Sequence, residues 1–341
     1  MSDPILFAPV GVKGKYHPPT DVAQQQWHSY IGPTPDRRVV MPSRTARAAM
    51  LLLLSISPAA AQSIDDGLMM PKGTLSLGVL YAHDSWDEYW EGPLKRTNGN
   101  IGTLSAQSVT GMVGYGLADR LSVMASLPYV KTHASQGVLH DESGFQDITI
   151  AAKLRLAGAR SETRGALGLF VAGTGAVPVS DYTPDFYPLS IGTGGGRASV
   201  RVTVSYKSPS LWFVNASSAY TFCSNVKLNR SSYYTDGRLY LTNEVAMPNV
   251  IDYTLTTGLD RGRLRIPVSL VQQRTLGGGD IRRQDMPFVS NRMNFTRVDG
   301  SVMYALPGNF SARLGAARVI GGRNVGQSTT FTTGVSYAHQ F

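Results

Sequence analysis

The last thirteen residues alternate between two kinds of side chain. From Thr329 to Phe341 one face carries mostly apolar or aromatic residues, and the other carries only small or polar ones. A two-residue period places successive side chains on opposite faces of a β-strand, so this segment predicts a strand with two chemically different faces. The same alternation recurs in 148–156 and 199–206, where charged residues occur only on the small-residue face. We therefore expect an all-β protein.

The connections between the predicted strands alternate in length. Twelve segments of this kind begin near residues 74, 103, 120, 146, 166, 198, 211, 250, 263, 291, 309 and 328. Short connections rich in turn-forming residues lie at 114–120, 158–165, 208–210, 260–263 and 307–309. Long ones lie at 84–102, 132–145, 179–197, 223–249, 276–290 and 321–327. Short turns at one rim and long loops at the other predict a transmembrane, antiparallel, up-and-down outer-membrane β-barrel of about 12 strands, because a Greek-key sandwich does not order its loops this way.

The stretch MPSRTARAAMLLLLSISPAAAQS (41–63) has the three parts of a secretory signal. Arg44 and Arg47 precede the apolar run 48–56, and the small residues 59–61 form a cleavage site. The apolar run is about half the length needed to cross a bilayer as a helix. We expect Met41 to be the true start and cleavage to follow Ala61. The chain is thereby divided into an upstream extension absent from the mature protein (1–40), a signal peptide (41–61) and the barrel (62–341).

Composition excludes several classes of protein. The chain has 32 Lys and Arg against 23 Asp and Glu, and removal of 1–61 takes away six basic and three acidic residues, so the mature net charge falls from +9 to +6. No cluster of Lys and Arg with interleaved aromatics occurs, so we expect no nucleic-acid partner. Cys223 is the single cysteine and cannot form an internal disulfide. No further long apolar run predicts a transmembrane helix.

Two adjacent segments resemble a known family. YGLADRLSVMASLPYV (115–130) and GFQDITIAAKLRL (144–156) combine a G-hydrophobic-x-D-R turn, a strand ending in L-P-Y-V, a long loop, and a G-x-x-D start to the next strand. This form resembles the outer-membrane transporters associated with the meta-cleavage pathway of phenol degradation, although Gln146 stands where members often carry glycine. The resemblance implies an outer-membrane barrel associated with hydrophobic or aromatic compounds.

The C-terminus also resembles a known signal. A terminal phenylalanine after alternating apolar residues is similar to the sequence that outer-membrane barrels present to their assembly machinery, so this machinery is an expected partner of Phe341. The other expected partners are outer-membrane lipid and lipopolysaccharide and a small-molecule solute. We expect the protein in the outer membrane of a Gram-negative bacterium with both termini in the periplasm.

Charged residues on the inward faces are candidate pore-lining groups. We assign this position to Lys153, Arg155, Arg201, Asp252, Arg265 and Arg313. Rings of like charge set the selectivity of pores, so the excess of cations predicts weak anion selectivity. Arg155, Arg265 and Arg313 lie close to short turns, where contact with lipid headgroups or pairing across the lumen is an equally good alternative.

One long loop is rich in aromatic residues. Trp86, Tyr89 and Trp90 follow the first strand, and they are candidates either for ligand capture or for contact with the outer leaflet. The neighbouring acidic residues lack the spacing of a calcium loop, so we expect no metal site. The histidines show no nucleophile and acid at matching positions, so we expect no catalytic residues, no cofactor and no enzymatic activity.

These observations favour a passive channel for uptake or efflux of small molecules, hydrophobic or aromatic in character. A barrel of 12 strands lies between filled eight-stranded and open sixteen-stranded barrels, so we expect a narrow or partly plugged lumen. Candidate plugs are 179–197, 223–249 and the N-terminal 62–73. Two alternatives stand: a general diffusion porin for small hydrophilic solutes, and a structural or adhesive barrel without transport.

Overall fold

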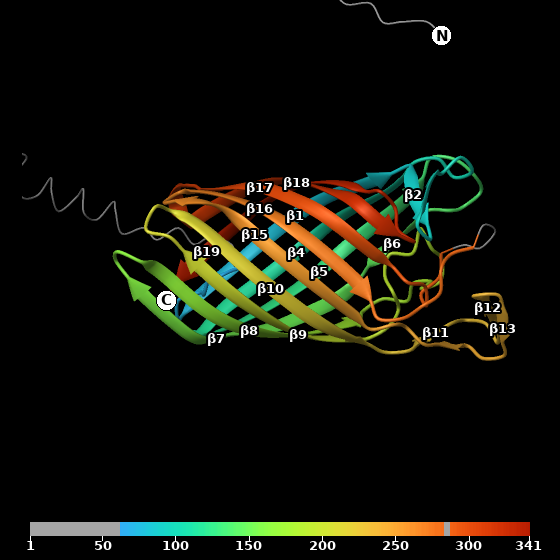
Figure 1. The fold of residues 1–341 in the computed structure, drawn as a ribbon, viewed down its shortest axis with the longest axis horizontal. Helices are drawn as coiled ribbons and strands as arrows, with labels where there is room; N and C mark the ends of the chain where they lie inside the picture. The colour runs from blue at the N-terminus through green and yellow to red at the C-terminus, as the bar shows by residue number, and fades with distance from the viewer. Residues whose placement is uncertain (1–61, 283–286) are drawn as a thin grey trace, which may run out of the picture. The chain divides into compact units, whose positions relative to one another are not determined.

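One sheet that closes on itself makes up most of the structure. The computed structural model describes residues 62–282 and 287–341, so the predicted extension and signal peptide lie outside the described residues. Each wall strand pairs antiparallel with its neighbours in chain order, and the last pairs with the first (Figure 1). The wall strands are β1 (Thr74–Trp86), β4 (Leu104–Ala118), β5 (Leu121–Ala134), β7 (Asp147–Ser161), β8 (Gly165–Pro178), β9 (Arg197–Lys207), β10 (Trp212–Cys223), β15 (Val250–Arg261), β16 (Leu264–Thr275), β17 (Asn294–Ala305), β18 (Phe310–Arg323) and β19 (Thr329–Gln340). The predicted 12-stranded antiparallel barrel is confirmed.

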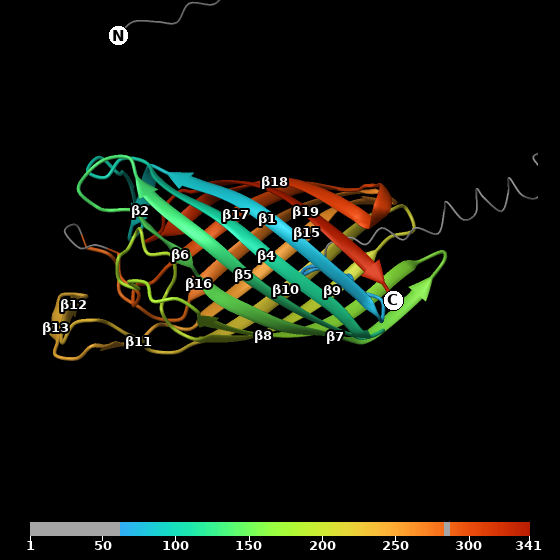
Figure 2. The ribbon, with the colours of Figure 1, turned by 180° about the vertical axis from the view of Figure 1, so that it is seen from behind.

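Short elements lie in the connections. They are β2 (Glu88–Glu91), β3 (Leu94–Thr97), β6 (Glu142–Phe145), β11 (Val226–Lys227), β12 (Tyr233–Thr235), β13 (Arg238–Tyr240), β14 (Glu244–Val245) and the 3₁₀ turn η1 (Pro307–Asn309). β6 pairs with the outer half of β5, and the others, η1 apart, form small hairpins or pairs at the long-loop end (Figure 2). No helix in 62–282 or 287–341 is long and apolar enough to span a membrane.

The predicted strand starts match the structure with one larger difference. β17 begins at Asn294 rather than near residue 291, because Asn291 is used in a loop turn. Its side-chain oxygen accepts the Phe288 amide at 2.6 Å, and its own amide donates to the Phe288 carbonyl at 2.9 Å. The predicted loop 84–102 also begins later, because β1 continues to Trp86 and pairs there with Leu104.

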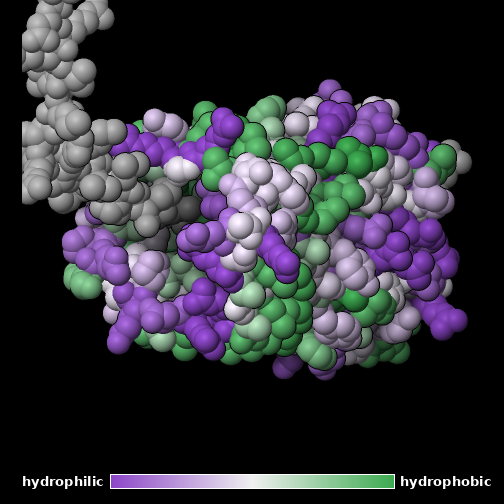
Figure 3. All heavy atoms as spheres, turned by 60° about the vertical axis from the view of Figure 1, so that its left-hand side comes forward, coloured by the Kyte–Doolittle hydropathy of each residue, from purple (hydrophilic) through white to green (hydrophobic). Residues whose placement is uncertain are grey.

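The two faces of the wall differ as the alternation requires. Val79, Val202 and Val335 point outward and are 55%, 46% and 52% exposed, whereas Ser122 and Thr203 point inward and are buried. Hydrophobic side chains gather over the middle of the visible face, with hydrophilic ones toward the ends (Figure 3). The apolar band faces outward, as in a barrel that lies in lipid.

The start of β1 and the end of β19 meet at the short-turn rim. The Phe341 amide donates to the Gly73 carbonyl at 3.0 Å, and the Gly73 amide donates to Gly116 at 2.8 Å. Exposed aromatic side chains gather near this rim: Tyr115, Trp212, Tyr304, Phe310 and Phe341. Tyr206 packs edge-on against Trp212 with ring centroids 5.3 Å apart. This arrangement is typical of an aromatic girdle at a membrane interface.

Candidate functional site in the barrel lumen

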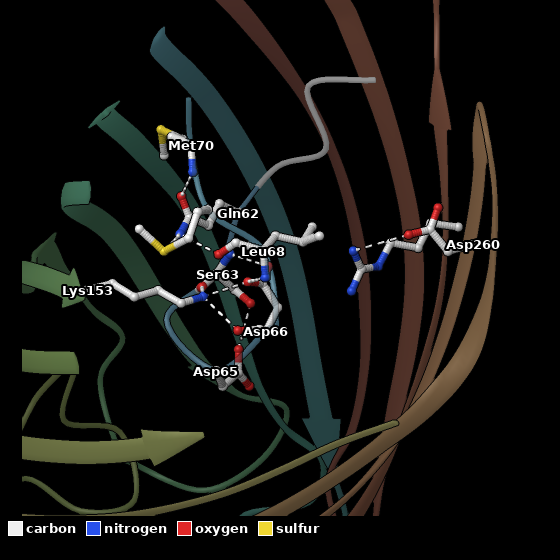
Figure 4. Close-up of polar contacts among 10 residues, drawn as sticks. Gln62, Ser63, Asp65, Asp66, Leu68, Met70, Lys153 and Asp260 are labelled. Carbon is white, nitrogen blue, oxygen red and sulfur yellow. Dashed lines mark hydrogen bonds and ion pairs between the residues drawn. The ribbon is translucent and has the colours of Figure 1, made fainter. Parts of the chain in front are cut away.

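Residues 62–73 run from the short-turn rim into the barrel. Met70 packs against Gly114 on the inner face of β4, and Gly67 lies against Ser205 and Asn215 on the inner faces of β9 and β10. The segment therefore contacts the inner faces of β4, β9 and β10. Figure 4 shows it beside Lys153. It folds compactly, because Asp66 accepts the amides of Ser63 and Leu68 at 2.8 and 2.9 Å.

Lys153 on β7 anchors this segment. Its ammonium group donates to the carbonyls of Ser63 and Asp66 at 2.8 and 2.7 Å and to the Asp66 carboxylate at 2.6 Å. The side chain is fully buried, and the Phe170 ring lies 5.3 Å away. A buried charge is costly unless it is paired and hydrogen-bonded. The segment supplies both the opposite charge and the acceptors that this lysine requires.

Glycine allows the segment to approach the wall closely. A side chain at Gly67 would overlap the Ser205 hydroxyl, and one at Gly114 would overlap the end of Met70. Gln62 closes the segment on itself, donating to the Leu68 carbonyl at 2.8 Å and accepting the Met70 amide at 3.0 Å. The segment is therefore a folded part of the lumen that packs closely against the barrel wall.

A cavity of about 290 Å³ remains beside the segment. Its floor is the inner face of β1 and β19, where Ser76, Gly78, Gly334 and Ser336 are too small to fill the space. Other lining residues include Met70, Met112, Met124, Met303, Arg313, Ser126 and Thr149. The cavity is therefore lined by small, hydroxyl, thioether and aliphatic side chains, with one amide from Gln62 and one guanidinium group from Arg313.

Most of the predicted pore-lining charges are neutralised in pairs. Arg201 bonds Asp252 at 2.8 Å, and Arg265 lies 3.9 Å from Asp260. Arg265 also stacks over Phe213, 4.4 Å from the ring centroid. Further inward acids pair with cations that the sequence analysis did not select: Asp147 with Arg197, Asp260 with Lys207 and Asp299 with Arg297. The lumen thus contains several pairs of oppositely charged side chains in addition to its excess of cations.

The remaining two predicted pore-lining cations lie in different surroundings. Arg155 donates to the Asp119 carbonyl at 3.2 Å, at the short turn between β4 and β5. Arg313 lines the cavity, and within the described part of the chain no hydrogen bond or ion pair involves its guanidinium group. The anion selectivity inferred from these residues stays a prediction, and Arg313 is the cation best placed to produce it.

The loop 179–196 enters the outer end of the barrel. Tyr182 donates to the inward-facing carboxylate of Asp147 at 2.5 Å, and Leu189 packs against Leu104 and Ala134 on the inner wall. Glu142 at the start of β6 holds the loop, because its carboxylate accepts hydrogen bonds from the amides of Thr183 and Ile191 at 2.9 and 3.2 Å. Of the two predicted loop plugs, this one reaches inward, whereas 224–249 packs against Phe288, Val289 and Tyr187.

Burial and the Asp147 carboxylate raise the pKa of Tyr182 well above its usual value of 10. A raised pKa means that the neutral phenol is favoured in the folded loop, so its contribution to stability is complete below pH 10 and is lost only above the raised pKa. The hydrogen bond is therefore maintained throughout the physiological pH range.

The predicted capture aromatics are packed into the outer loops. Trp90 is 9% exposed and lies against Gly322, and Trp86 lies against Gly326. Tyr89 is partly buried, with its ring centroid 6.3 Å from that of Trp86. A role in ligand capture stays a prediction. In residues 62–282 and 287–341 no group of His, Cys, Asp or Glu is arranged to hold a metal ion.

The sequence analysis did not select the methionines or Asp66. Met112, Met124 and Met303 occupy inward positions otherwise held by small or polar residues, so the same alternation that assigned Lys153 would have found them. Asp66 gave no such signal, because it lies in a non-strand segment 87 residues before its partner.

A closed barrel with an apolar outer band and an aromatic rim defines an outer-membrane β-barrel. The chain belongs to the family described as "Putative MetA-pathway of phenol degradation", whose model matches residues 95–334. The family resemblance seen in the sequence is thereby confirmed. No curated protein matches the sequence.

Solved structures of outer-membrane barrels share this fold. An outer membrane channel from Pseudomonas putida F1 is 16% identical, with a TM-score of 0.61 over 81% of this chain and 100% of its own. The CymD monoaromatic hydrocarbon channel is 13% identical, with a TM-score of 0.40 over 80% of this chain and 89% of its own. The first likeness supports the fold.

Proposed function

We propose that the protein is a passive outer-membrane channel for small hydrophobic or aromatic molecules. The observation that carries this proposal is the 290 Å³ cavity between residues 62–70 and the small-residue face of β1 and β19. Ligand sites are typically concave and largely apolar with a few placed polar groups, and this lining fits that description. The family description refers to degradation of phenol, which is itself an aromatic compound.

Two other functions are less well supported. A general diffusion porin requires an open, water-filled lumen, whereas here the N-terminal segment crosses the lumen and is bonded to Lys153. A purely structural or adhesive barrel requires no internal ligand space, so the cavity argues against it. We also propose that the protein catalyses no reaction, since the similar structure from Pseudomonas putida F1 is an outer membrane channel.

The orientation and partners complete this proposal. The short-turn rim carries both ends of the described barrel, and in outer-membrane barrels this rim faces the periplasm. Phe341 is then available to the assembly machinery before insertion, and it stays exposed at the rim. The apolar outer band is the surface that contacts outer-membrane lipid and lipopolysaccharide.

Uptake by intact Gram-negative cells tests the proposal, because lipopolysaccharide slows the entry of hydrophobic solutes. Cells that produce the protein are compared with cells that lack it, using radiolabelled phenol and a radiolabelled disaccharide. We expect initial phenol uptake to rise several-fold while disaccharide uptake does not change. A rise in disaccharide uptake alone would support the diffusion porin, and no change in either would support the structural barrel.

A further inference from the structure

The cavity has three chemically different parts, and each restricts its occupant. The first is the space itself, which exists because four small residues lie side by side on β1 and β19. Gly78 pairs with Ser336 and Leu80 pairs with Gly334 in the strand register, with Ser76 one inward position before Gly78. An apolar cavity of roughly 150 Å³ holds benzene. A cavity of about 290 Å³ therefore accommodates one aromatic ring with polar substituents.

The second part is a group of methionines from three strands and the N-terminal segment. Met70 and Met124 meet over Gly114, where a side chain would lie 3.2 Å from the Met70 sulfur and 3.5 Å from Met124. Met112 reaches across to Gly78, and Met303 neighbours Arg313 across β17 and β18. Thioether groups are flexible and make favourable contacts with aromatic rings. These residues can therefore pack around a flat aromatic ring and contact it through their sulfur atoms.

The third part is the guanidinium group of Arg313. In the strand register it lies between Met303 on β17 and Gly334 on β19, so no side chain covers it on the β19 side. Lys153, Arg201 and Arg265 have carboxylate partners, whereas Arg313 has none within the part of the chain that the structure describes. Guanidinium groups bind carboxylates through paired hydrogen bonds of matching geometry.

We infer that the cavity binds single-ring aromatic carboxylates, with the carboxylate on Arg313 and the ring among Met70, Met112, Met124 and Met303. This inference rests on the proposed function and names a substrate class within it. The hydroxyl groups of Ser76, Ser126 and Thr149 provide hydrogen bonds for further ring substituents. A neutral aromatic gains only the contacts with the methionines, so the anion is bound more tightly.

Binding of two probes of similar shape tests the inference. Benzoate and benzyl alcohol are titrated at pH 8 into the protein purified from outer membranes, and binding is measured by isothermal titration calorimetry. Arg313→Met replaces the guanidinium group with another thioether, and Arg313→Lys keeps the charge but not the paired donors. Arg318→Met, on the outward face of the same strand, is the matched control. Heat-modifiable migration on gels verifies that each variant is folded.

We expect Arg313→Met to weaken benzoate binding at least tenfold and to change benzyl alcohol binding less than twofold. The benzoate affinity of Arg313→Lys is expected to lie between those of Arg313→Met and the unaltered protein. The benzoate affinity of Arg318→Met is expected to equal that of the unaltered protein. Equal benzoate affinity in folded Arg313→Met would overturn the inference. Benzyl alcohol binding without benzoate binding would also overturn the inference but leave the proposed function standing. If neither probe binds and phenol uptake is the same in cells with and without the protein, both the inference and the proposed function are overturned.

Discussion

At the scale of single residues, Lys153 combines a position that was predictable with a partner that was not. Strand alternation places it inward, between Ala151 and Arg155. The alternation does not specify Asp66, because the contact depends on where a segment without regular structure enters the barrel. An inward lysine in a water-filled pore would stay solvated, whereas this lysine is fully buried. Its charge therefore requires the N-terminal segment.

Lys153→Met tests this dependence. Removing one member of a buried ion pair costs roughly 3–5 kcal/mol, and the solvent that reaches Asp66 reduces this figure. A loss of only about 1.4 kcal/mol raises the detached population of the segment roughly tenfold. We expect hydrogen exchange of the Leu68 and Met70 amides to accelerate at least about tenfold. The control is Lys131→Met, which alters an exposed lysine on β5. Unchanged exchange in the folded variant would contradict the role of Lys153 as an anchor.

At the scale of elements, the loop 179–196 is held by side chains from neighbouring strands. Tyr182 contributes twice, because its hydroxyl donates to Asp147 and accepts the Gly194 amide at 3.0 Å. Its inward placement follows from Asp147, whose position was predictable from the strand pattern. The partner residue within a loop rich in glycine was not predictable, since glycine permits many loop conformations.

Tyr182→Phe should loosen this loop without unfolding the barrel. The change removes both hydrogen bonds and leaves the Gly194 amide without its partner, at a cost of roughly 1–3 kcal/mol. We expect hydrogen exchange in 190–196 to accelerate at least severalfold, with no change in the wall strands. Tyr234→Phe, on the exposed β12–β13 hairpin, serves as the control. Equal exchange in the two variants would show that Tyr182 does not hold the loop.

A second element, the outer-loop network around Asp280, depends on pH. Arg323 donates to Asp280 at 2.7 and 2.5 Å, and Asn324 donates at 2.8 Å. The hydrogen bond from Arg323 is the main cause that lowers the pKa of Asp280 from 3.8 to about 2. A lowered pKa means that this contribution to stability is complete above pH 3.8 and is lost as the pH falls through 2.

We therefore expect pepsin to cleave within 276–282 slowly at pH 4 and quickly near pH 2. In Asp280→Asn the carboxylate is absent, so cleavage should be fast at both pH values. Asp141→Asn removes a carboxylate from an exposed pair with His133, outside this network, and should behave as the unaltered protein. Fast cleavage of the unaltered protein at pH 4 would rule out the proposed protection by Asp280.

At the scale of the whole molecule, the sequence predicts the barrel better than it predicts the lumen. Lipid imposes the same outward chemistry on every strand, so a two-residue period reveals all twelve strands and their faces. The lumen has no such uniform rule, since each inward residue packs against whichever segment enters. Met303 and Arg313 are adjacent because β17 and β18 pair in one register. Their shared cavity depends on the space left between residues 62–70 and the inner face of β1 and β19.

Adjacent residues on a wall strand face opposite sides of the barrel, so an introduced charge should have different effects on stability at two neighbouring positions. Val335 and Ser336 are neighbours on β19, but the Val335 side chain points outward and is 52% exposed, whereas Ser336 lies on the inner face and pairs with Gly78. An arginine on the lipid face near the bilayer midplane costs roughly 2–4 kcal/mol. An arginine at 336 extends into the cavity and displaces its contents instead. We expect Val335→Arg to reduce the folded fraction strongly in urea titrations in lipid vesicles, and Ser336→Arg to reduce it little. Equal losses in the two variants would refute the assignment of the two faces, and a larger loss in Ser336→Arg would reverse it.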